Sequence, residues 1–310
     1  AGLWPTAGNV NAIGLFGGGR QQDDNRSNVI STISIPTTGN ATDYGDLLVG
    51  TESTASCSST TRGLFAGGYS TSYTNVIQYA SFASAGNATD FGDLTITRSE
   101  LSGCSNSTRG LFSAGFTSSE SITNVIDYVT IASTGNATDF GDLLDPRKQT
   151  CSLASSTRGI SAGGLNGANF AQPDVVYMTI ATTGNATDFG DLTISRAGLA
   201  GCASATRGLM SGGNTGSDTH VNTIDYITIA STGNATDFGD LSVSRAYLAA
   251  CSSLTRGVFG GGSNSGQVTK LNTIDYVTID TTGNATDFGD LIVAVQQISG
   301  CSNNHGGLAA

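Results

Sequence analysis

Residues 86–94 read Gly-Asn-Ala-Thr-Asp-Phe-Gly-Asp-Leu, and this phrase decides the fold because it occurs six times in the chain. The copies occupy residues 39–47 (with Tyr44 in place of Phe), 86–94, 135–143, 184–192, 233–241 and 283–291. Successive copies lie 47, 49, 49, 49 and 50 residues apart. A near-constant period in this range is typical of a solenoid or a propeller, in which each repeat packs on its neighbours. We therefore expect residues 1–310 to form a single repeat domain.

The composition indicates short strands joined by tight turns rather than helices. Charged residues make up only 12% of the chain, about half the usual share, and the chain contains 43 glycines. The net charge of −11 argues against nucleic acid and anionic membranes as partners, because both require Lys and Arg. No segment approaches the roughly 20 consecutive apolar residues of a membrane helix.

The N-terminal sequence AGLWPTAGNVNAIGLF has no basic region followed by an apolar run, so we do not expect a signal peptide. The chain does not begin with Met. We therefore expect it to be a processed protein or, more readily, a piece of a longer one.

Each repeat divides into four strand-like segments, called strands a to d. In one repeat these are Ser99–Cys104, Arg109–Gly115, Asn124–Ile131 and about Phe140–Leu144. Strand c is rich in β-branched and aromatic residues. It carries apolar residues at both odd and even positions, which suits a sheet covered on both faces. Four strands in each of six repeats predict an all-β, six-bladed β-propeller.

The two ends of the sequence predict how the ring closes. The first strand-like segment, Gly14–Gly19, corresponds to strand b and has no strand a before it. The last one, Ile298–Cys301, corresponds to a spare strand a. We expect the two to share one blade, which closes the ring and leaves no long free edge.

The six cysteines are spread one to a repeat. Equivalent positions on separate blades would lie too far apart for disulfides, so we expect free, buried thiols that act as small apolar side chains. A metal-binding ring of thiolates is not favoured, because neither His nor a CxxC spacing supports it. The residues are Cys57, Cys104, Cys151, Cys202, Cys251 and Cys301.

The repeat resembles kelch repeats in four features, and the resemblance implies a propeller but says little about function. Paired glycines follow strand b at Gly17-Gly18, Gly67-Gly68, Gly163-Gly164, Gly212-Gly213 and Gly261-Gly262. A tyrosine occurs in strand c at Tyr79, Tyr128, Tyr177, Tyr226 and Tyr276. An aromatic residue precedes a Leu by three positions, as in Phe91 and Leu94, and Arg follows that Leu by four at Arg98, Arg147, Arg196 and Arg245. The pattern is broken at Ala114-Gly115, Thr32, Thr51 and Val295.

The two faces of the predicted ring differ in sequence. The a–b and c–d loops share one face and repeat almost unchanged, whereas the b–c loops on the other face all differ. Loops that are free to differ are where binding residues usually lie, although unconstrained drift would look the same. The b–c loops are residues 20–27, 69–74, 116–123, 165–172, 214–221 and 263–271. Within them we select Tyr69, Tyr73, Phe116, Phe170, His220 and Lys270 as candidate binding residues.

The repeated aspartates are interpreted as structural turn residues, because Asp and Asn bond nearby backbone amides in turns. They are Asp43, Asp46, Asp90, Asp93, Asp139, Asp142, Asp188, Asp191, Asp237, Asp240, Asp287 and Asp290. They could instead bind Ca²⁺, but the motif lacks the alternating carboxylates of a calcium loop, so no cofactor or metal is expected. The Arg of each Thr-Arg-Gly, such as Arg62, could pair with one of them. The Asn of each Asn-Ala-Thr sequon is likewise interpreted as a turn residue rather than a glycosylated one.

Catalysis is not expected. The sequence has only two histidines, His220 and His305, and contains no Ser-His-Asp set or HExxH motif. Strings such as NTIDYVTI, TGNATDFGDL and CSSLTRGVFGGG resemble repeats in virion structural and tail-fibre proteins of marine bacteriophages, notably those of cyanobacteria. That resemblance implies an extracellular, particle-borne interaction module, whose partner is a host surface protein or glycan met by the b–c loops. The alternatives are a structural decoration or spacer that packs on other virion proteins, and a lectin with six equivalent glycan sites.

Overall fold

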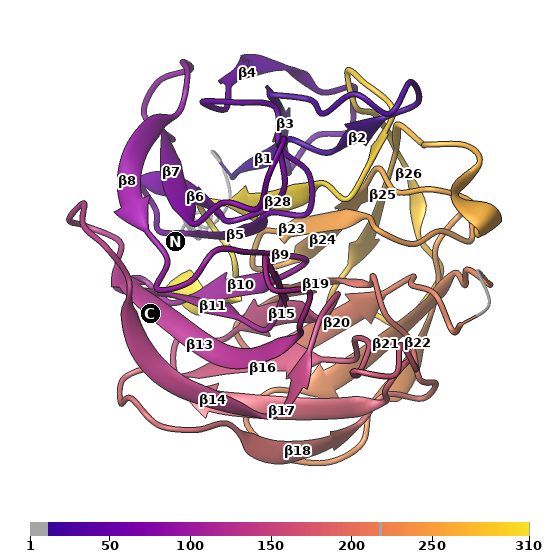
Figure 1. Cartoon of the computed structure of the whole chain (residues 1–310). Helices are drawn as coiled ribbons and strands as arrows, with labels where there is room; N and C mark the ends of the chain where they lie inside the picture. Colours follow the sequence, from indigo (N-terminus) through magenta and orange to yellow (C-terminus); the bar gives the residue numbers. More distant parts are fainter. Residues whose placement is uncertain (1–11, 217–218, 310) are drawn as a thin grey trace, which may run out of the picture.

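The computed structural model describes residues 12–216 and 219–309 as a six-bladed propeller of four-stranded antiparallel sheets (Figure 1). Blade 1 contains β28 (Ser299–Ser302), β1 (Ile13–Gly17), β3 (Val29–Ser34) and β4 (Thr42–Asp46). Blade 2 contains β5 (Ala55–Ser58), β6 (Arg62–Ala66), β7 (Val76–Ser81) and β8 (Thr89–Asp93). Blade 3 contains β10 (Ser102–Ser105), β11 (Arg109–Ser113), β13 (Thr123–Thr130) and β14 (Thr138–Arg147).

The remaining blades follow the same order from the inner strand a to the outer strand d. Blade 4 contains β15 (Cys151–Ala154), β16 (Arg158–Ala162), β17 (Asp174–Thr179) and β18 (Thr187–Asp191). Blade 5 contains β19 (Ala200–Ala203), β20 (Arg207–Ser211), β21 (Thr223–Thr228) and β22 (Thr236–Asp240). Blade 6 contains β23 (Ala249–Ser252), β24 (Arg256–Gly260), β25 (Thr273–Thr278) and β26 (Thr286–Asp290). Outside the blades the described residues form two short two-stranded sheets and two 3-10 helices, η1 (Ser265–Gln267) and η2 (Gly306–Leu308). Neither helix has the length or apolarity of a membrane span.

Blade 1 closes the ring as the sequence predicts. The C-terminal β28 pairs with β1, with Leu15 opposite Cys301 and Phe16 opposite Gly300. In Figure 1 the last strand therefore lies beside the first, although almost the whole chain separates them. Closure places a strand from each end of the fold in one sheet, so opening the ring requires breaking that sheet.

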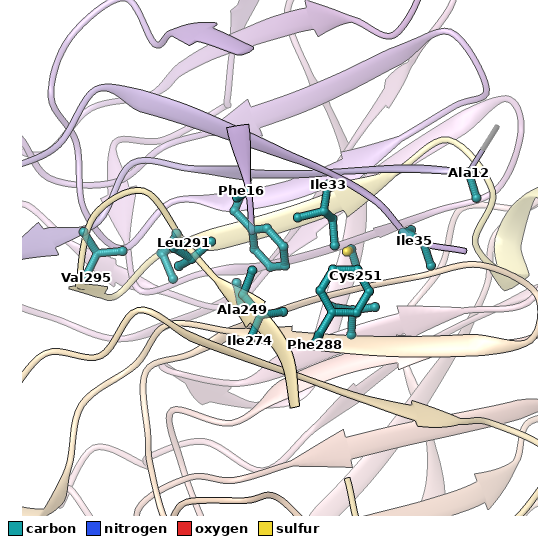
Figure 2. Packing of buried hydrophobic residues seen from close by; sticks show 13 residues of the cluster. Ala12, Phe16, Ile33, Ile35, Ala249, Cys251, Ile274, Phe288, Leu291 and Val295 are labelled. Atoms are coloured by element: carbon teal, nitrogen blue, oxygen red, sulfur yellow. The ribbon is translucent and has the colours of Figure 1, made fainter. Parts of the chain in front are cut away.

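Apolar side chains from adjacent blades fill each blade interface. At the closing interface, Phe16 and Ile33 of blade 1 pack with Cys251, Ile274 and Phe288 of blade 6 (Figure 2). Burying an aromatic or large aliphatic side chain in this way contributes about 1.5–3 kcal/mol. Both faces of each sheet are thus covered, which explains why strand c carries apolar residues at both parities.

The repeated motif lies on strand d, so the prediction that its aspartates occupy turns is wrong. The segment Thr-Asp-Phe-Gly-Asp, with Tyr44 in place of Phe in blade 1, lies in strand d of every blade. In blade 2 a β-bulge separates the pairs Ile77–Gly92 and Gln78–Asp90. The bulge accommodates the extra residue, so that both aspartates stay in the sheet. The correction applies to Asp43, Asp46, Asp90, Asp93, Asp139, Asp142, Asp188, Asp191, Asp237, Asp240, Asp287 and Asp290. Strand a in blade 3 is also shifted, to Ser102–Ser105.

The near-identity of the six copies of the motif is explained by a set of hydrogen bonds between adjacent blades, which we call the clasp. In blade 2 the backbone N–H of Gly86 donates to the carbonyl of Tyr44 (2.7 Å), and that of Ala88 donates to the carbonyl of Asp46 (2.8 Å). Asn87 Oδ1 accepts from the backbone N–H of Asp46 at 3.1 Å. The clasp recurs at all six junctions and closes on itself where Asn40 accepts from the amide of Asp290.

The clasp covers the outer edge of strand d and accounts for its glycine. A Cβ added at Gly45 would lie 2.4 Å from the carbonyl oxygen of Gly86 in the next blade, so only Gly permits this approach. Each exposed sheet edge is thereby paired with the following repeat, which removes a template for aggregation.

The Arg of Thr-Arg-Gly does not pair with the motif aspartates as the sequence suggested. The guanidinium carbon of Arg62 lies 4.7 Å from the ring centroid of Tyr79, and its Nη1 donates to the carbonyl of Ile131 at 3.0 Å. The Tyr79 ring in turn meets Phe91 edge-on, with 6.1 Å between centroids. Blades 3 to 6 repeat this Arg–Tyr–Phe stack, which ties strands b, c and d together.

A second arginine, located after strand d, forms an ion pair inside the next blade. Arg98 Nη2 lies 3.0 Å from Asp127 Oδ2, and both side chains are fully buried. Arg196–Asp225 and Arg245–Asp275 are equivalent pairs. Where the arginine is missing, at Thr51 and Val295, the partner position is Gln78 or Ser31, so neither blade contains an unpaired buried charge.

All six cysteines are free and buried, as predicted, but they are not all at equivalent positions. Cys57, Cys104, Cys202, Cys251 and Cys301 each pack against the strand b glycine of the next blade. In blade 4 that position is Leu153, and Cys151 lies two residues earlier on the strand. The first pair of kelch-like glycines also shifts by one, because Gly18 and Gly19, with φ of 74° and 100°, match Gly67 and Gly68.

Ring closure predicts the outcome of a truncation. Deleting residues 296–310 removes β28 and exposes an edge of β1, so we expect a large fall in melting temperature. Deleting only residues 303–310 leaves β28 in place and removes η2, so the difference between the two deletions isolates the contribution of β28. Differential scanning calorimetry checks both, and equal melting temperatures for the parent and the 296–310 deletion would contradict closure by β28.

The cysteine environment predicts unreactive thiols. Burial raises the pKa of Cys104 and Cys301 to about 12, so the thiolate form is scarce at neutral pH. We expect the thiols of the folded protein to react slowly with a thiol reagent. In the denatured protein we expect six thiols to react per chain. Rapid labelling of the folded protein, or a disulfide found by non-reducing mass analysis, would contradict this interpretation.

Candidate binding face and groove

The b–c loops and the d–a connections lie on one face of the ring, which we call the loop face. Each d–a connection pairs with the start of the next b–c loop, as in Glu52 with Tyr69, and as in β9 (Arg98–Ser99) with β12 (Phe116–Thr117). β27 (Val295–Gln296) pairs likewise with β2 (Arg20–Gln21). The opposite face, which we call the hairpin face, carries the a–b and c–d loops. The sequence-based assignment of loops to faces is therefore consistent with the strand pairing.

Three of the predicted aromatic residues form one continuous stack on the loop face. The rings of Tyr69 and Tyr73 meet at 5.1 Å between centroids, and those of Tyr73 and Phe116 meet at 6.0 Å. A cation covers each end: Arg26 lies over Tyr69 and Lys148 over Phe116, each 4.7 Å from the ring centroid. The stack connects loops of four successive blades. These three aromatics are thus half-buried rather than exposed, since neighbouring loops cover their faces.

The other predicted residues divide between exposed and buried positions. Phe170 is 68% exposed. His220 is only 5% exposed, and its Nδ1 lies 2.9 Å from the carbonyl oxygen of Ser263. Lys270 has an 8% exposed side chain, and its Nζ lies 3.3 Å from Asp24 Oδ1. His220 and Lys270 hold adjacent loops together, so neither side chain is freely exposed on this face, and their role in binding stays a prediction. Residues 217–218 of the fifth b–c loop lie outside the described residues.

A groove of about 820 Å³ lies between the b–c loops of blades 3 and 4. Its volume falls within the roughly 300–1,000 Å³ of small-molecule sites. Polar, charged and apolar side chains line it together, namely Phe116, Glu120, Ser121, Ile122, Asp145, Pro146, Arg147, Lys148, Asn166, Asn169 and Gln172, with the backbone of Gly167. Sequence reasoning identified only Phe116 of this set.

The two cations of the groove are already paired with carboxylates. Arg147 Nη2 lies 2.9 Å from Asp174 Oδ2 and 3.8 Å from Asp145 Oδ2. Lys148 Nζ lies 3.6 Å from Glu100 Oε2, and Gln149 Nε2 donates to the same oxygen at 3.0 Å. The cationic side chains that line the groove are therefore held in ion pairs, and the groove is not a surface patch of a single charge sign.

The groove occurs where blade 4 departs from the repeat. At the position of Asp145 the other repeats have Val49, Ile96, Ile194, Val243 and Val293. Blade 4 also has Val176 where blades 3, 5 and 6 carry the buried aspartate, and the carboxylate that pairs with its arginine is instead Asp174 at the start of β17. Arg147 pairs with this displaced carboxylate, and it is the last residue of β14, which extends over ten residues. The sequence signal is Asp-Pro-Arg at 145–147, which breaks the repeat in one copy.

The axial channel is narrow at both ends. On the loop face, six residues of the d–a connections form a closed circle of backbone N–H to carbonyl hydrogen bonds of 2.7–3.0 Å. These residues are Ser53, Glu100, Gln149, Gly198, Tyr247 and Gln297, and all have φ between 55° and 64°. The space beneath, between the inner strands, is only about 50 Å³.

The C-terminal segment plugs the channel at the hairpin face. Gly306 and Gly307 of η2 are buried against the inner strands. His305 Nε2 lies 3.3 Å from the carbonyl oxygen of Ser58, and its Nδ1 accepts from the N–H of Gly307 at 3.1 Å. This pairing suits a neutral imidazole with its proton on Nε2. Burial lowers the pKa of His305 to about 4.

Among residues 12–216 and 219–309, no group of three or more His, Cys, Asp or Glu is placed to hold a metal ion. No protein-family model matches the chain, and no curated protein matches it either.

The plug predicts a pH dependence of stability. The folded pKa of about 4 lies below the ordinary 6.5, so the unfolded state binds the extra proton between these values. The stabilisation is complete above pH 6.5 and is lost as pH falls towards 4, by up to about 3 kcal/mol. Replacing His305→Gln should flatten that part of the curve of unfolding free energy against pH. Parallel curves for parent and variant between pH 4 and 7 would contradict it.

Proposed function

We propose that this chain is a non-catalytic binding module that meets its partner with the loop face. What supports this is the difference between the faces. On the hairpin face the repeated residues form the clasp, so they are committed to holding the ring together. On the loop face the loops differ from blade to blade, and a partner would meet one unique surface.

The observation that carries the proposal is the groove between blades 3 and 4. It depends on residues such as Asp145 and Pro146 that no other repeat has at these positions, so it offers one site rather than six. Sites of this size with a few convergent polar groups are where ligands bind. In this proposal the chain is carried on a bacteriophage particle, as the resemblance of its repeats to those of phage virion proteins implies. Its partner is then a host-surface protein or glycan.

An apolar rim favours a second candidate, a structural spacer that packs on other virion proteins. The rim consists of exposed aliphatic side chains that follow strand d in several blades, and exposed apolar surface marks protein contacts. It comprises Leu48, Val49, Leu144, Ile194, Val243 and Ile292. A lectin with six equivalent sites has less support, because the Asn Oδ1 atoms on the hairpin face already accept clasp hydrogen bonds.

The proposal predicts which face matters for cell binding. Phe170→Ser with Val268→Ser changes two loop-face side chains that are 68% and 69% exposed, so folding should be unaffected. We expect at least tenfold weaker binding of the labelled chain to marine cyanobacterial cells, as for loss of a hot spot. The measurement is a cell-pelleting titration.

The matched control changes the hairpin face. Asn87→Ala with Asn136→Ala removes two clasp hydrogen bonds and should lower the free energy of unfolding by about 1 kcal/mol each, while binding stays unchanged. Thr134→Ala, at an exposed residue of the same hairpin, should change neither quantity. Loss of binding in the Asn variant together with normal binding of the Phe170 and Val268 variant would sink the assignment of faces. Loss of virion assembly without loss of cell binding would favour the spacer.

A further inference from the structure

The groove has the hydrogen-bonding groups that polyhydroxylated ligands use. Glu120 and Asp145 contribute carboxylate acceptors, whereas Asn166, Asn169 and Gln172 contribute amides that both donate and accept. A hydroxyl group is itself both donor and acceptor, so it can satisfy either kind. Two amides are held in position: Asn166 Oδ1 accepts from the N–H groups of Ala168 and Phe170, and Gln172 Nε2 donates to the carbonyl of Phe170.

The charge of the groove argues against an acidic ligand. Glu120 and Asp145 balance Arg147 and Lys148 among the lining residues. Glu100 and Asp174, which pair with those cations, add two further negative charges next to the wall. A sulfate, phosphate or carboxylate ligand would compete with the existing carboxylates for Arg147 and Lys148 and would be repelled by them. An uncharged ligand leaves both pairs intact.

The shape and apolar content of the groove fit an oligosaccharide better than a protein surface. Stable protein interfaces usually need about 800 Å² on each partner with an apolar centre. Here the apolar groups are few and dispersed among polar ones, and Lys148 already covers one face of Phe116. Ile122 and Pro146 provide small apolar contacts of the kind that meet the C–H face of a sugar ring.

We infer that this groove is the binding site for a short, uncharged oligosaccharide segment. The inference rests on the proposed function and narrows its partner to one class of ligand at one place on the loop face. Asp145 determines the specificity: where Val or Ile stands at this position in the other blades, no carboxylate is available to accept from sugar hydroxyls.

The test is isothermal titration calorimetry of the whole chain with tetrasaccharides. The neutral probes are the linear tetrasaccharides of glucose, mannose and galactose; the acidic probes are a heparin-derived tetrasaccharide and tetragalacturonate. We expect saturable binding of at least one neutral probe and at least tenfold weaker binding of the acidic ones. Absence of saturable binding by any neutral probe, or tighter binding of an acidic probe, would overturn the inference.

Two variants locate the site. Asp145→Val introduces the residue type of the other blades and leaves Arg147 with Asp174, so the protein should fold. Asn169→Gly removes an exposed side chain of the groove at a φ of 60°, which glycine adopts without strain. Both should weaken neutral-probe binding at least tenfold, whereas Val243→Ala, at the position of Asp145 in blade 5, should not. Unchanged binding by both variants, with unaltered melting temperatures, would overturn the location.

The two proposals fail in different ways. Cell binding that depends on Phe170 and Val268, combined with no binding of any neutral probe, would overturn the glycan inference and leave a protein receptor as the partner. Neutral-probe binding lost in Asp145→Val, combined with normal cell binding by the Phe170 and Val268 variant, would support the groove as a glycan site. Cell binding would then need to be tested with Asp145→Val, which must reduce it if the groove contacts the host.

Discussion

The clasp between blades is the interaction on which the rest of the structure depends. At each junction two backbone hydrogen bonds and one Asn side chain join a blade to the outer strand of its predecessor, and the sixth junction returns to the first. Each such bond contributes only about 1 kcal/mol. Their arrangement in a closed ring matters more, because no blade can separate without breaking two junctions. The clasp also covers the outer sheet edges, which lets a chain with few charged residues avoid edge-to-edge pairing.

The buried Arg–Asp ion pair varies between blades, and where the arginine is missing, the aspartate is missing too. Arg98 and Asp127 recur as a buried pair in blades 5 and 6, and in blades 1 and 2 both members are replaced by uncharged residues. In blade 4 the pair survives in a displaced form, between Arg147 and Asp174 near the surface. That displacement brings charged groups to the loop face and extends β14 beside the groove. The candidate site thus arises where a core pair moved outward, at the one junction that departs most from the repeat.

The blades and strands predicted from the sequence period agree with the structure. The wrong predictions concern short segments whose sequence fits two different local structures. Ring closure by β28 and the free, buried cysteines follow from the sequence, because repetition and strand composition constrain them strongly. The Asp pair looked like a turn, but a β-bulge at Gly92 keeps Asp90 and Asp93 in strand d. Cys151 appeared equivalent to the other cysteines, yet the strand register places Leu153 at their position. A shift of two residues preserves the face of a strand and is invisible to alternation alone.

By itself the sequence determined the number of blades, the order of strands and the division into a constant and a varied face, because each property is repeated and so specified several times. Only the tertiary structure decided what the varied loops do. Tyr69, Tyr73 and Phe116 stack on one another, and His220 and Lys270 join neighbouring loops, because each loop leans on the next around the ring. The groove brings together residues 116–122, 145–148 and 166–172, which approach one another only when two blades pack side by side. Single, unrepeated contacts of this kind leave no periodic trace in a sequence, so packing alone reveals them.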